Sequence, residues 1–264
     1  MSGPPENSVM GRPTCAILPA VDKEPPGGER IDFGQFDVLT FDCYGTLMDW
    51  ETGILTALRA ATPEDWPAND EELLERFAVH ESTAERGTYR TYRAVLAETI
   101  RGVANDYGVV VSDEAVRRFS ASVGDWPAFP DSTDALARLG RRFRLGVITN
   151  CDNDLFAASN ERLGVRFDWV MTAEETKSYK PSPKNFEQAF ARIPAPRERI
   201  LHVAQSLYHD HAPAQRLGMT TVWIDRRHGR TGSGATPPAQ VEPDVTFPSM
   251  SAFADAAVPA FRPA

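Results

Sequence analysis

Short apolar runs alternate with longer helical patterns along much of this chain. Residues 38–41 form one such run, which ends directly before Asp42 and is typical of a short buried strand. Similar runs predict further strands over residues 143–149, 169–171, 200–204 and 220–224. Between these runs, helical segments are expected over residues 132–140, 183–191 and 212–217. Because strands and helices alternate, we predict an α/β fold with a Rossmann-like, doubly wound parallel sheet.

The stretch after the first predicted strand has a different pattern. Apolar residues recur at helical spacing from residue 51 to about residue 107, and no convincing strand interrupts them. We therefore predict a helical cap domain over residues 50–124, inserted into a core domain made of residues 32–49 and 125–264. Residues 1–31 are rich in proline, glycine and charge and lack periodicity, which predicts a flexible tail.

The composition is that of an ordinary globular protein and narrows the classes of partner. The 264 residues carry a net charge of −9, which disfavours nucleic acid or an anionic membrane as a partner. No apolar run is long enough to span a bilayer, and the N-terminal residues lack a signal-peptide pattern, so we expect a cytoplasmic enzyme. The three cysteines, at positions 15, 43 and 151, predict reduced thiols rather than a disulfide framework.

The first candidate catalytic residue is Asp42, which follows the first predicted strand and precedes a turn at Gly45. The carboxyl ends of parallel strands are where open α/β sheets bind ligands. A carboxylate at this place can act as a covalent nucleophile. His202, His209 and His211 do not indicate a zinc or iron site, because metal ligands need convergent geometry and His202 falls inside a predicted strand.

Four segments in order resemble the motifs of the haloacid dehalogenase superfamily. They are residues 42–46, residues 149–150 at the end of a strand, Lys180 before a proline, and residues 204–210. The resemblance runs from about residue 36 to residue 225 and implies the predicted core and cap. It leaves the reaction open, because the superfamily is dominated by magnesium-dependent phosphatases.

Two departures from the phosphatase pattern favour one branch of the superfamily. Tyr44 stands where the phosphatases have the aspartate that protonates the leaving oxygen, and a phenol with a pKa near 10 replaces it poorly. Gln205 stands where they have a metal-binding carboxylate, and magnesium prefers carboxylates. A halide leaves as a stable anion and needs no proton. The pattern therefore resembles the 2-haloacid dehalogenases and implies a reaction without a metal or another cofactor.

The resemblance also implies roles for individual residues. Asp42 would attack the halogen-bearing carbon of a small 2-haloacid, and water would hydrolyse the resulting ester to a 2-hydroxy acid. Lys180 would keep Asp42 ionised, Thr46 would brace it, and Asp210 would position the water. Substrate binding is assigned to Tyr44, Thr149 and Asn150. The dehalogenases also place a cap arginine near the halide; no arginine aligns uniquely with it, and the candidates are Arg86 and Arg93.

Two other functions compete with this interpretation. The first is a magnesium-dependent phosphatase of the same fold that acts on a small phosphorylated metabolite, which magnesium dependence would distinguish. The second is a non-catalytic binding protein, against which the combination of Asp42, Lys180 and Asp210 argues. A homodimer formed through the cap is compatible with the resemblance, and a small-molecule haloacid is the expected partner.

Overall fold

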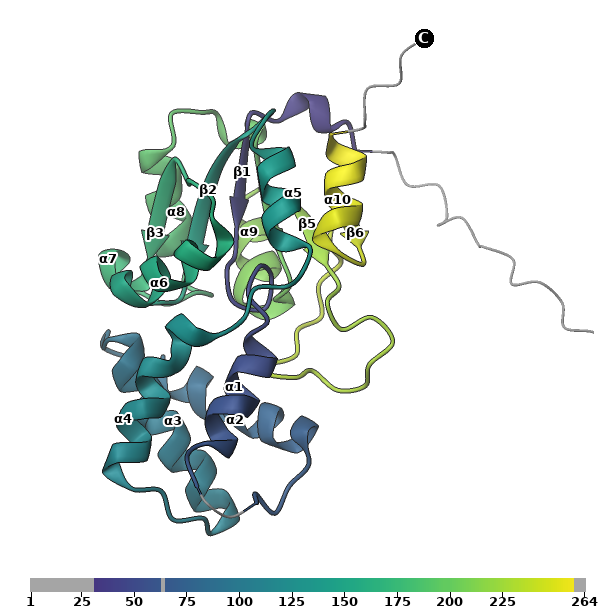
Figure 1. Ribbon diagram of the computed structural model, residues 1–264. Helices are drawn as coiled ribbons and strands as arrows, with labels where there is room; N and C mark the ends of the chain where they lie inside the picture. The colour runs from purple at the N-terminus through teal and green to yellow at the C-terminus, as the bar shows by residue number, and fades with distance from the viewer. Residues whose placement is uncertain (1–30, 63–64, 259–264) are drawn as a thin grey trace, which may run out of the picture. The chain divides into compact units, whose positions relative to one another are not determined.

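The computed structural model describes residues 31–62 and 65–258, and these residues contain one six-stranded parallel sheet (Figure 1). The strands are β1 (Val38–Phe41), β2 (Arg144–Thr149), β3 (Trp169–Thr172), β4 (Ile200–Ala204), β5 (Thr220–Ile224) and β6 (Val245–Phe247). Their order across the sheet is β3-β2-β1-β4-β5-β6, so β1 lies between β2 and β4. The predicted doubly wound parallel sheet is confirmed, and β6 is a strand that the sequence pattern did not predict.

Helices cover both faces of this sheet, as expected where parallel strands are apolar on both sides. The core helices are α5 (Ser132–Leu139), α6 (Asn153–Leu163), α7 (Ala173–Thr176), α8 (Pro183–Arg192), α9 (Ala212–Arg216) and α10 (Met250–Ala257). One face packs against α8 and α9 through a cluster that includes Val38, Ile148, Phe186 and Ala214. Figure 1 shows α5 and α10 on the other face. Short helical turns complete the core: η1 (Phe33–Gln35), η2 (Ser122–Asp125), η3 (Arg197–Arg199) and η4 (Leu207–His211).

Four further helices lie between β1 and β2 in the chain and form the cap. They are α1 (Trp50–Arg59), α2 (Asp70–Ala84), α3 (Tyr92–Tyr107) and α4 (Asp113–Ala121). Each begins at a side chain that accepts a hydrogen bond from the first turn, namely Asp49, Asn69, Thr91 and Ser112. The inserted helical cap is confirmed, whereas its boundaries at residues 50 and 124 stay predictions. The predicted tail, apart from residue 31, lies outside the described residues.

The loop between β5 and β6 is joined to the cap by Arg227. Its Nη1 donates to both carboxylate oxygens of Glu51 in α1, and its Nη2 donates to both of Glu71 in α2, all at 2.6 Å. Gly234 of the same loop has φ +62°, and a Cβ there would collide with the Glu51 carboxylate. Two charge-assisted ion pairs, one from each terminal nitrogen of Arg227, therefore connect this core loop to two cap helices.

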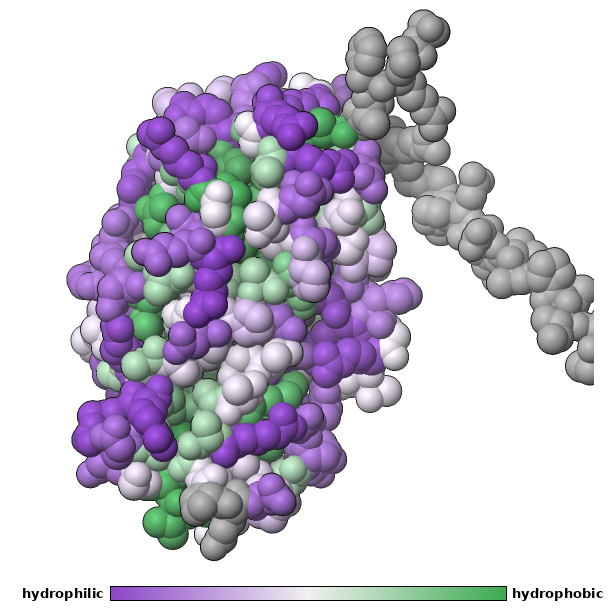
Figure 2. Space-filling model, in the orientation of Figure 1, coloured by the Kyte–Doolittle hydropathy of each residue, from purple (hydrophilic) through white to green (hydrophobic). Residues whose placement is uncertain are grey.

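The surface is mixed in character. Figure 2 shows hydrophilic and hydrophobic residues interspersed on the visible face, without one apolar area that dominates it. The large apolar side chains exposed among the described residues are Val79 and Val110, both in the cap segment. None of the helices that the structure describes combines the length and the apolar character needed to cross a bilayer.

Candidate active site

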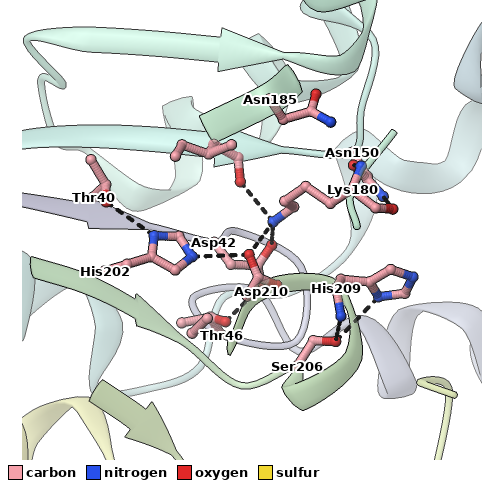
Figure 3. A network of polar contacts seen from close by, with 12 residues as sticks. Thr40, Asp42, Thr46, Asn150, Lys180, Asn185, His202, Ser206, His209 and Asp210 are labelled. Atoms are coloured by element: carbon pink, nitrogen blue, oxygen red, sulfur yellow. Dashed lines mark hydrogen bonds and ion pairs between the residues drawn. The ribbon is translucent and has the colours of Figure 1, made fainter. Parts of the chain in front are cut away.

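Three charged side chains meet at the carboxyl edge of the sheet (Figure 3). Lys180 Nζ donates to Asp42 Oδ1 at 2.8 Å, to Asp210 Oδ1 at 2.6 Å and to the carbonyl oxygen of Ile148 at 2.8 Å. These three bonds use all three protons of the ammonium group. Thr46 Oγ1 donates to the other Asp42 oxygen at 2.6 Å and itself accepts from the backbone N–H of Gln205 at 2.9 Å. Asp42 is thus held at both oxygens.

The topology of the sheet explains why residues far apart in sequence converge here. Asp42 follows β1, and Asp210 lies in the turn η4 that follows the neighbouring strand β4. Parallel strands end at the same edge, so these two carboxylates come together. Gly45, with φ +90°, lets the chain turn sharply after Asp42, in a conformation that glycine adopts without strain. Lys180 reaches the edge from the loop between α7 and α8.

One ammonium group bonds to two buried carboxyl groups, and the pKa values of these two groups shift in opposite directions. For Asp210, burial opposes ionisation, but Lys180 and a hydrogen bond from His202 outweigh it and lower the pKa. For Asp42, burial is the largest influence and the Asp210 charge adds to it, so its pKa is raised despite Lys180. Burial alone would lower the pKa of Lys180, yet the two carboxylates raise it. The ammonium form of Lys180 is therefore secured.

Sequence reasoning left His202 without a role, and the structure places it directly behind Asp210. Its Nε2 lies 3.0 Å from Asp210 Oδ1, and its Nδ1 lies 3.0 Å from the hydroxyl of Thr40 in β1. The hydroxyl can donate to Nδ1, which leaves the imidazole proton on Nε2 to donate to Asp210. A histidine in a strand gave no reason to expect this contact, because it depends on the pairing of β1 with β4.

The residues predicted to bind substrate have different environments. Asn150 supports the backbone of Lys180: its Oδ1 accepts from the Lys180 N–H at 2.7 Å and its Nδ2 donates to the Lys180 carbonyl at 3.0 Å. The Tyr44 hydroxyl lies 3.0 Å from Ser159 Oγ and 3.4 Å from Cys151 Sγ. Thr149 is buried, and its hydroxyl lacks a hydrogen-bond partner within the described residues. Asn150 and Tyr44 border the cavity at Asp42, and Thr149 does not.

That cavity, hereafter the inner cavity, has a volume of about 30 Å³. The core contributes Asp42, Tyr44, Asn150, Lys180, Ser206, His209 and Asp210 to its wall. The cap contributes Trp50, Glu81, Glu85 and Tyr92. In this arrangement of cap and core, the space next to Asp42 is small. Asp210 Oδ2, which is buried and has no partner among the described residues, is available to accept a hydrogen bond.

The two cap glutamates were not expected at this site. Glu81 accepts a hydrogen bond of 2.5 Å from the Tyr92 hydroxyl, and Glu85 accepts one of 3.1 Å from Asn150 Nδ2. Burial raises the pKa of Glu81 to about 8, and it raises the pKa of Glu85 well above its usual range. Burial therefore favours the protonated form of both carboxyl groups. In the sequence they resemble the exposed acids of any helix, and only the packing of α2 on the core distinguishes them.

The two arginines considered for the halide lie elsewhere. Arg93 forms a bidentate ion pair with Asp154 of α6, with both distances at 2.7 Å. Arg86 is exposed and borders a different pocket, next to Tyr89 and Lys177. The structure therefore brings neither arginine to the inner cavity.

Comparison with known proteins places this arrangement in a family. The model of the haloacid dehalogenase-like hydrolases matches residues 36–218. The chain belongs to this family. An (S)-2-haloacid dehalogenase of Pseudomonas putida is 26% identical to the chain over 200 residues, which cover 72% of this chain and 85% of that protein. Haloacetate dehalogenase H-2 of a Moraxella species is 24% identical over 227 residues, covering 83% of this chain and 96% of that protein.

A solved structure of a family member has the same fold. The L-2-haloacid dehalogenase from Xanthobacter autotrophicus matches with a TM-score of 0.70 and 16% sequence identity. The match covers 86% of this chain and all of that chain, at 100%. This likeness concerns the fold, and the chemistry is argued from the residues of this chain.

A magnesium ion, the cofactor of the phosphatases in the superfamily, does not fit the donors at this site. The Lys180 ammonium lies between Asp42 and Asp210 and bonds to one oxygen of each, so it already supplies positive charge to both carboxylates. Gln205 borders two surface cavities near Trp223 and Arg226 instead of the inner cavity. Within residues 31–62 and 65–258, no group of three or more His, Cys, Asp or Glu side chains is arranged to hold a metal ion.

Proposed function

We propose that this chain hydrolyses the carbon–halogen bond of small 2-haloalkanoic acids and releases 2-hydroxy acids. The observation that carries the proposal is the fixed Asp42 carboxylate, held by the Lys180 ammonium and the Thr46 hydroxyl at the inner cavity. A carboxylate held in this way is a nucleophile that needs no metal ion to orient it. The similarity to haloacid and haloacetate dehalogenases supports the same reaction.

The proposed reaction has two steps. An Asp42 oxygen attacks the carbon that bears the halogen, the halide leaves with the bonding electrons, and an ester forms. Water then attacks the Asp42 carbonyl carbon, and the bond between this carbon and the ester oxygen breaks, which regenerates the Asp42 carboxylate. The ester oxygen leaves on the substrate carbon as the hydroxyl of the 2-hydroxy acid, so the configuration is the inverted one set by the first step. Asp210 Oδ2, the buried acceptor without a partner in the described residues, is suited to orient this water. Lys180 balances the negative charge that the nucleophile carries before attack and regains after hydrolysis.

The Tyr44 hydroxyl is already hydrogen-bonded to other side chains, which favours dehalogenation over phosphate transfer. In the phosphatases of the superfamily this position carries the acid that protonates the departing oxygen. Here burial raises the pKa of Tyr44 well above 10, and its hydroxyl contacts Ser159 and Cys151. A phenol in this state is a poor general acid near neutral pH, whereas a halide needs none.

Halide release from chloroacetate, fluoroacetate and both enantiomers of 2-chloropropionate, measured in excess EDTA, tests the proposal. Release that persists in EDTA is the expected result and would rank the substrates. Absence of release, together with magnesium-dependent hydrolysis of p-nitrophenyl phosphate, would replace this proposal with a phosphatase. A cytoplasmic location and a homodimer stay predictions from the sequence, and light scattering of the purified protein would test the dimer.

A further inference from the structure

Asp152 follows β2 in the same loop as Asn150 and stands at the N-cap position of α6. An aspartate at this position ordinarily accepts a hydrogen bond from the first turn of the helix that it begins. The Asp152 side chain makes no such bond to α6, although the residue is only 2% exposed. The carboxylate is therefore turned away from its own helix and toward partners in another element.

These partners belong to the cap. Asp152 Oδ1 accepts from the backbone N–H of Tyr92 at 2.8 Å, and Oδ2 accepts from that of Arg93 at 3.1 Å. The two donors are the first residues of α3, where backbone N–H groups have no partner within the helix. The next N–H, that of Ala94, donates to the side chain of Thr91 in the cap itself. A core carboxylate thus completes the N-terminus of a cap helix, where negative charge is stabilised.

The same cap segment, residues 89–93, contacts a second loop of the core. The hydroxyl of Tyr179 donates to the carbonyl oxygen of Arg90 at 2.9 Å. The Tyr179 ring is stacked on the Tyr89 ring, with centroids 5.5 Å apart. Tyr179 directly precedes Lys180 in the loop between α7 and α8. Both core loops that hold the cap segment therefore also carry residues of the candidate active site.

The position of this segment decides one wall of the inner cavity. Tyr92 is 2% exposed and borders the cavity, and its hydroxyl donates to Glu81, which borders the cavity too. The atom that donates to Asp152 is thus the backbone nitrogen of a residue in the cavity wall. Asp42 and the side chains that hold it come from the core. A displacement of α3 would therefore open the cavity without disturbing the nucleophile.

We propose that Asp152 is a positioning residue that keeps the cap closed on the core and so holds Tyr92 at the inner cavity. The closed cap is the form in which residues 89–93 contact the two core loops. One carboxylate accepts from two N–H groups of one helix end, which a neutral side chain of the same size does not reproduce. The neighbouring pair of Arg93 with Asp154 is a weaker support, because the Asp154 side chain is 67% exposed.

Limited trypsin digestion of the full-length protein measures closure without substrate. The peptide bond after Arg90 is the reporter, because its carbonyl oxygen is bonded to Tyr179 and not to Asp152. Cleavage requires this segment to leave the core, so the rate follows the population of open molecules. The rate should rise about tenfold in Asp152→Asn, which retains one acceptor oxygen, and by more in Asp152→Ser, whose hydroxyl is too short to bond to both N–H groups.

The variants and controls distinguish closure from folding. Asparagine and serine are as favourable as aspartate at an N-cap, so both variants preserve the start of α6. Asp113→Asn is the matched control, because Asp113 lies in the first turn of the cap helix α4, is 81% exposed, and should leave the rate unchanged. Cleavage after Arg76, in the middle of α2, requires that helix to unfold and is the internal reference for global unfolding.

Steady-state kinetics give a second readout, and this one rests on the proposed dehalogenation. Substrate that binds beneath the closed cap favours the closed form, so saturating substrate restores it. In Asp152→Ser the KM for 2-chloropropionate should therefore rise about tenfold, while kcat stays within about threefold of wild type. A defect in folding would instead lower kcat through the loss of active molecules and leave KM unchanged.

Three results would overturn the inference. The first is equal cleavage after Arg90 in wild type and in both Asp152 variants. The second is equal acceleration after Arg76 and Arg90, and the third is a lower kcat with an unchanged KM in Asp152→Ser. Faster cleavage after Arg90 in the variants of a protein that releases no halide would remove the proposed dehalogenation and leave the role of Asp152 standing. Halide release by a wild type whose variants are cleaved no faster would do the reverse.

Discussion

The Lys180 ammonium donates a hydrogen bond of 2.8 Å to the carboxylate of Asp42. Both groups are buried, so neither charge is compensated by water if its partner is removed. Lys180→Met should lower the rate of halide release by about a thousandfold, because Asp42 loses the cation that orients it and balances its charge, and losing one such preorganised electrostatic contact costs roughly 10²–10³ in kcat. Lys184→Met, at an exposed lysine of α8, is the control and should retain full activity. Halide release above a tenth of the wild-type rate in Lys180→Met would contradict the role of Lys180.

Asp42→Asn tests the nucleophile itself. An amide oxygen is a far weaker nucleophile than a carboxylate, so turnover should fall by several orders of magnitude while the fold persists. Asp37→Asn is a suitable comparison, since Asp37 precedes β1 and pairs with Arg199 at the surface. A rate above about a tenth of wild type, a loss of less than ~1.4 kcal/mol, would exclude covalent attack by Asp42.

Tyr44→Phe asks whether the phenol takes part in the chemistry. The Tyr44 hydroxyl is engaged with Ser159 and Cys151, and its ring packs edge-on against Trp126 at a centroid distance of 5.7 Å. Removal of the hydroxyl should change kcat by less than about fivefold, because the halide needs no proton and a lost hydrogen bond of this kind contributes about 1 kcal/mol. A fall of a hundredfold in steady-state turnover would instead assign the hydroxyl a catalytic role.

His202→Phe removes the donor behind Asp210. His202 lies 3.0 Å from Asp210 Oδ1 and helps to lower the pKa of that carboxyl group. In the variant the Asp210 pKa should rise, so the acid limb of the kcat profile should move to higher pH. A packing defect would reduce kcat without moving that limb, and such a result would show that His202 only fills space. His228→Phe, at a side chain that is 80% exposed, should leave the profile unchanged.

The free energy of unfolding should depend on pH through the buried side chain of His211. His211 Nε2 lies 3.0 Å from the Ala204 carbonyl, and burial lowers the pKa of His211 to about 4. The unfolded chain takes up this proton near pH 6.5, so the contribution of neutral His211 is full above pH 6.5 and is lost as the pH falls toward 4. In urea denaturation, the loss of stability between pH 7.5 and pH 4.5 should be smaller in His211→Gln by roughly 2–3 kcal/mol. The same loss in His211→Gln and in His228→Gln would refute this.

The local sequence pattern of apolar residues was sufficient to predict the buried strands of the sheet. Strands β1, β4 and β5 begin and end where the apolar runs predict, and Asp42 follows β1 as expected. The short strand β6 has no fully buried residue, so its sequence carries no apolar signal. Asp42, Thr46, Lys180 and Asp210 come together as the motif order implies.

The residues that sequence reasoning missed are those whose environment is created by tertiary packing. Glu81 and Glu85 occupy a charged helix that looks solvent-exposed by composition, and the core buries them. His202 acquires its role from a neighbouring strand and a turn eight residues later. The arginines near residue 90 looked suitable by charge and position, but Arg93 is held by Asp154, which the sequence gave no reason to connect with it.

The ion pairs of Arg227 with Glu51 and Glu71 limit which segments of this enzyme can be exchanged with those of its relatives. A chimera that exchanged only the four cap helices would leave a guanidinium group, 9% exposed, facing whatever residues the donor protein supplies. An uncompensated charge at such depth destabilises a fold. The loop from β5 to β6 and the cap therefore form a single transplantable module, and any exchange should carry both pieces together.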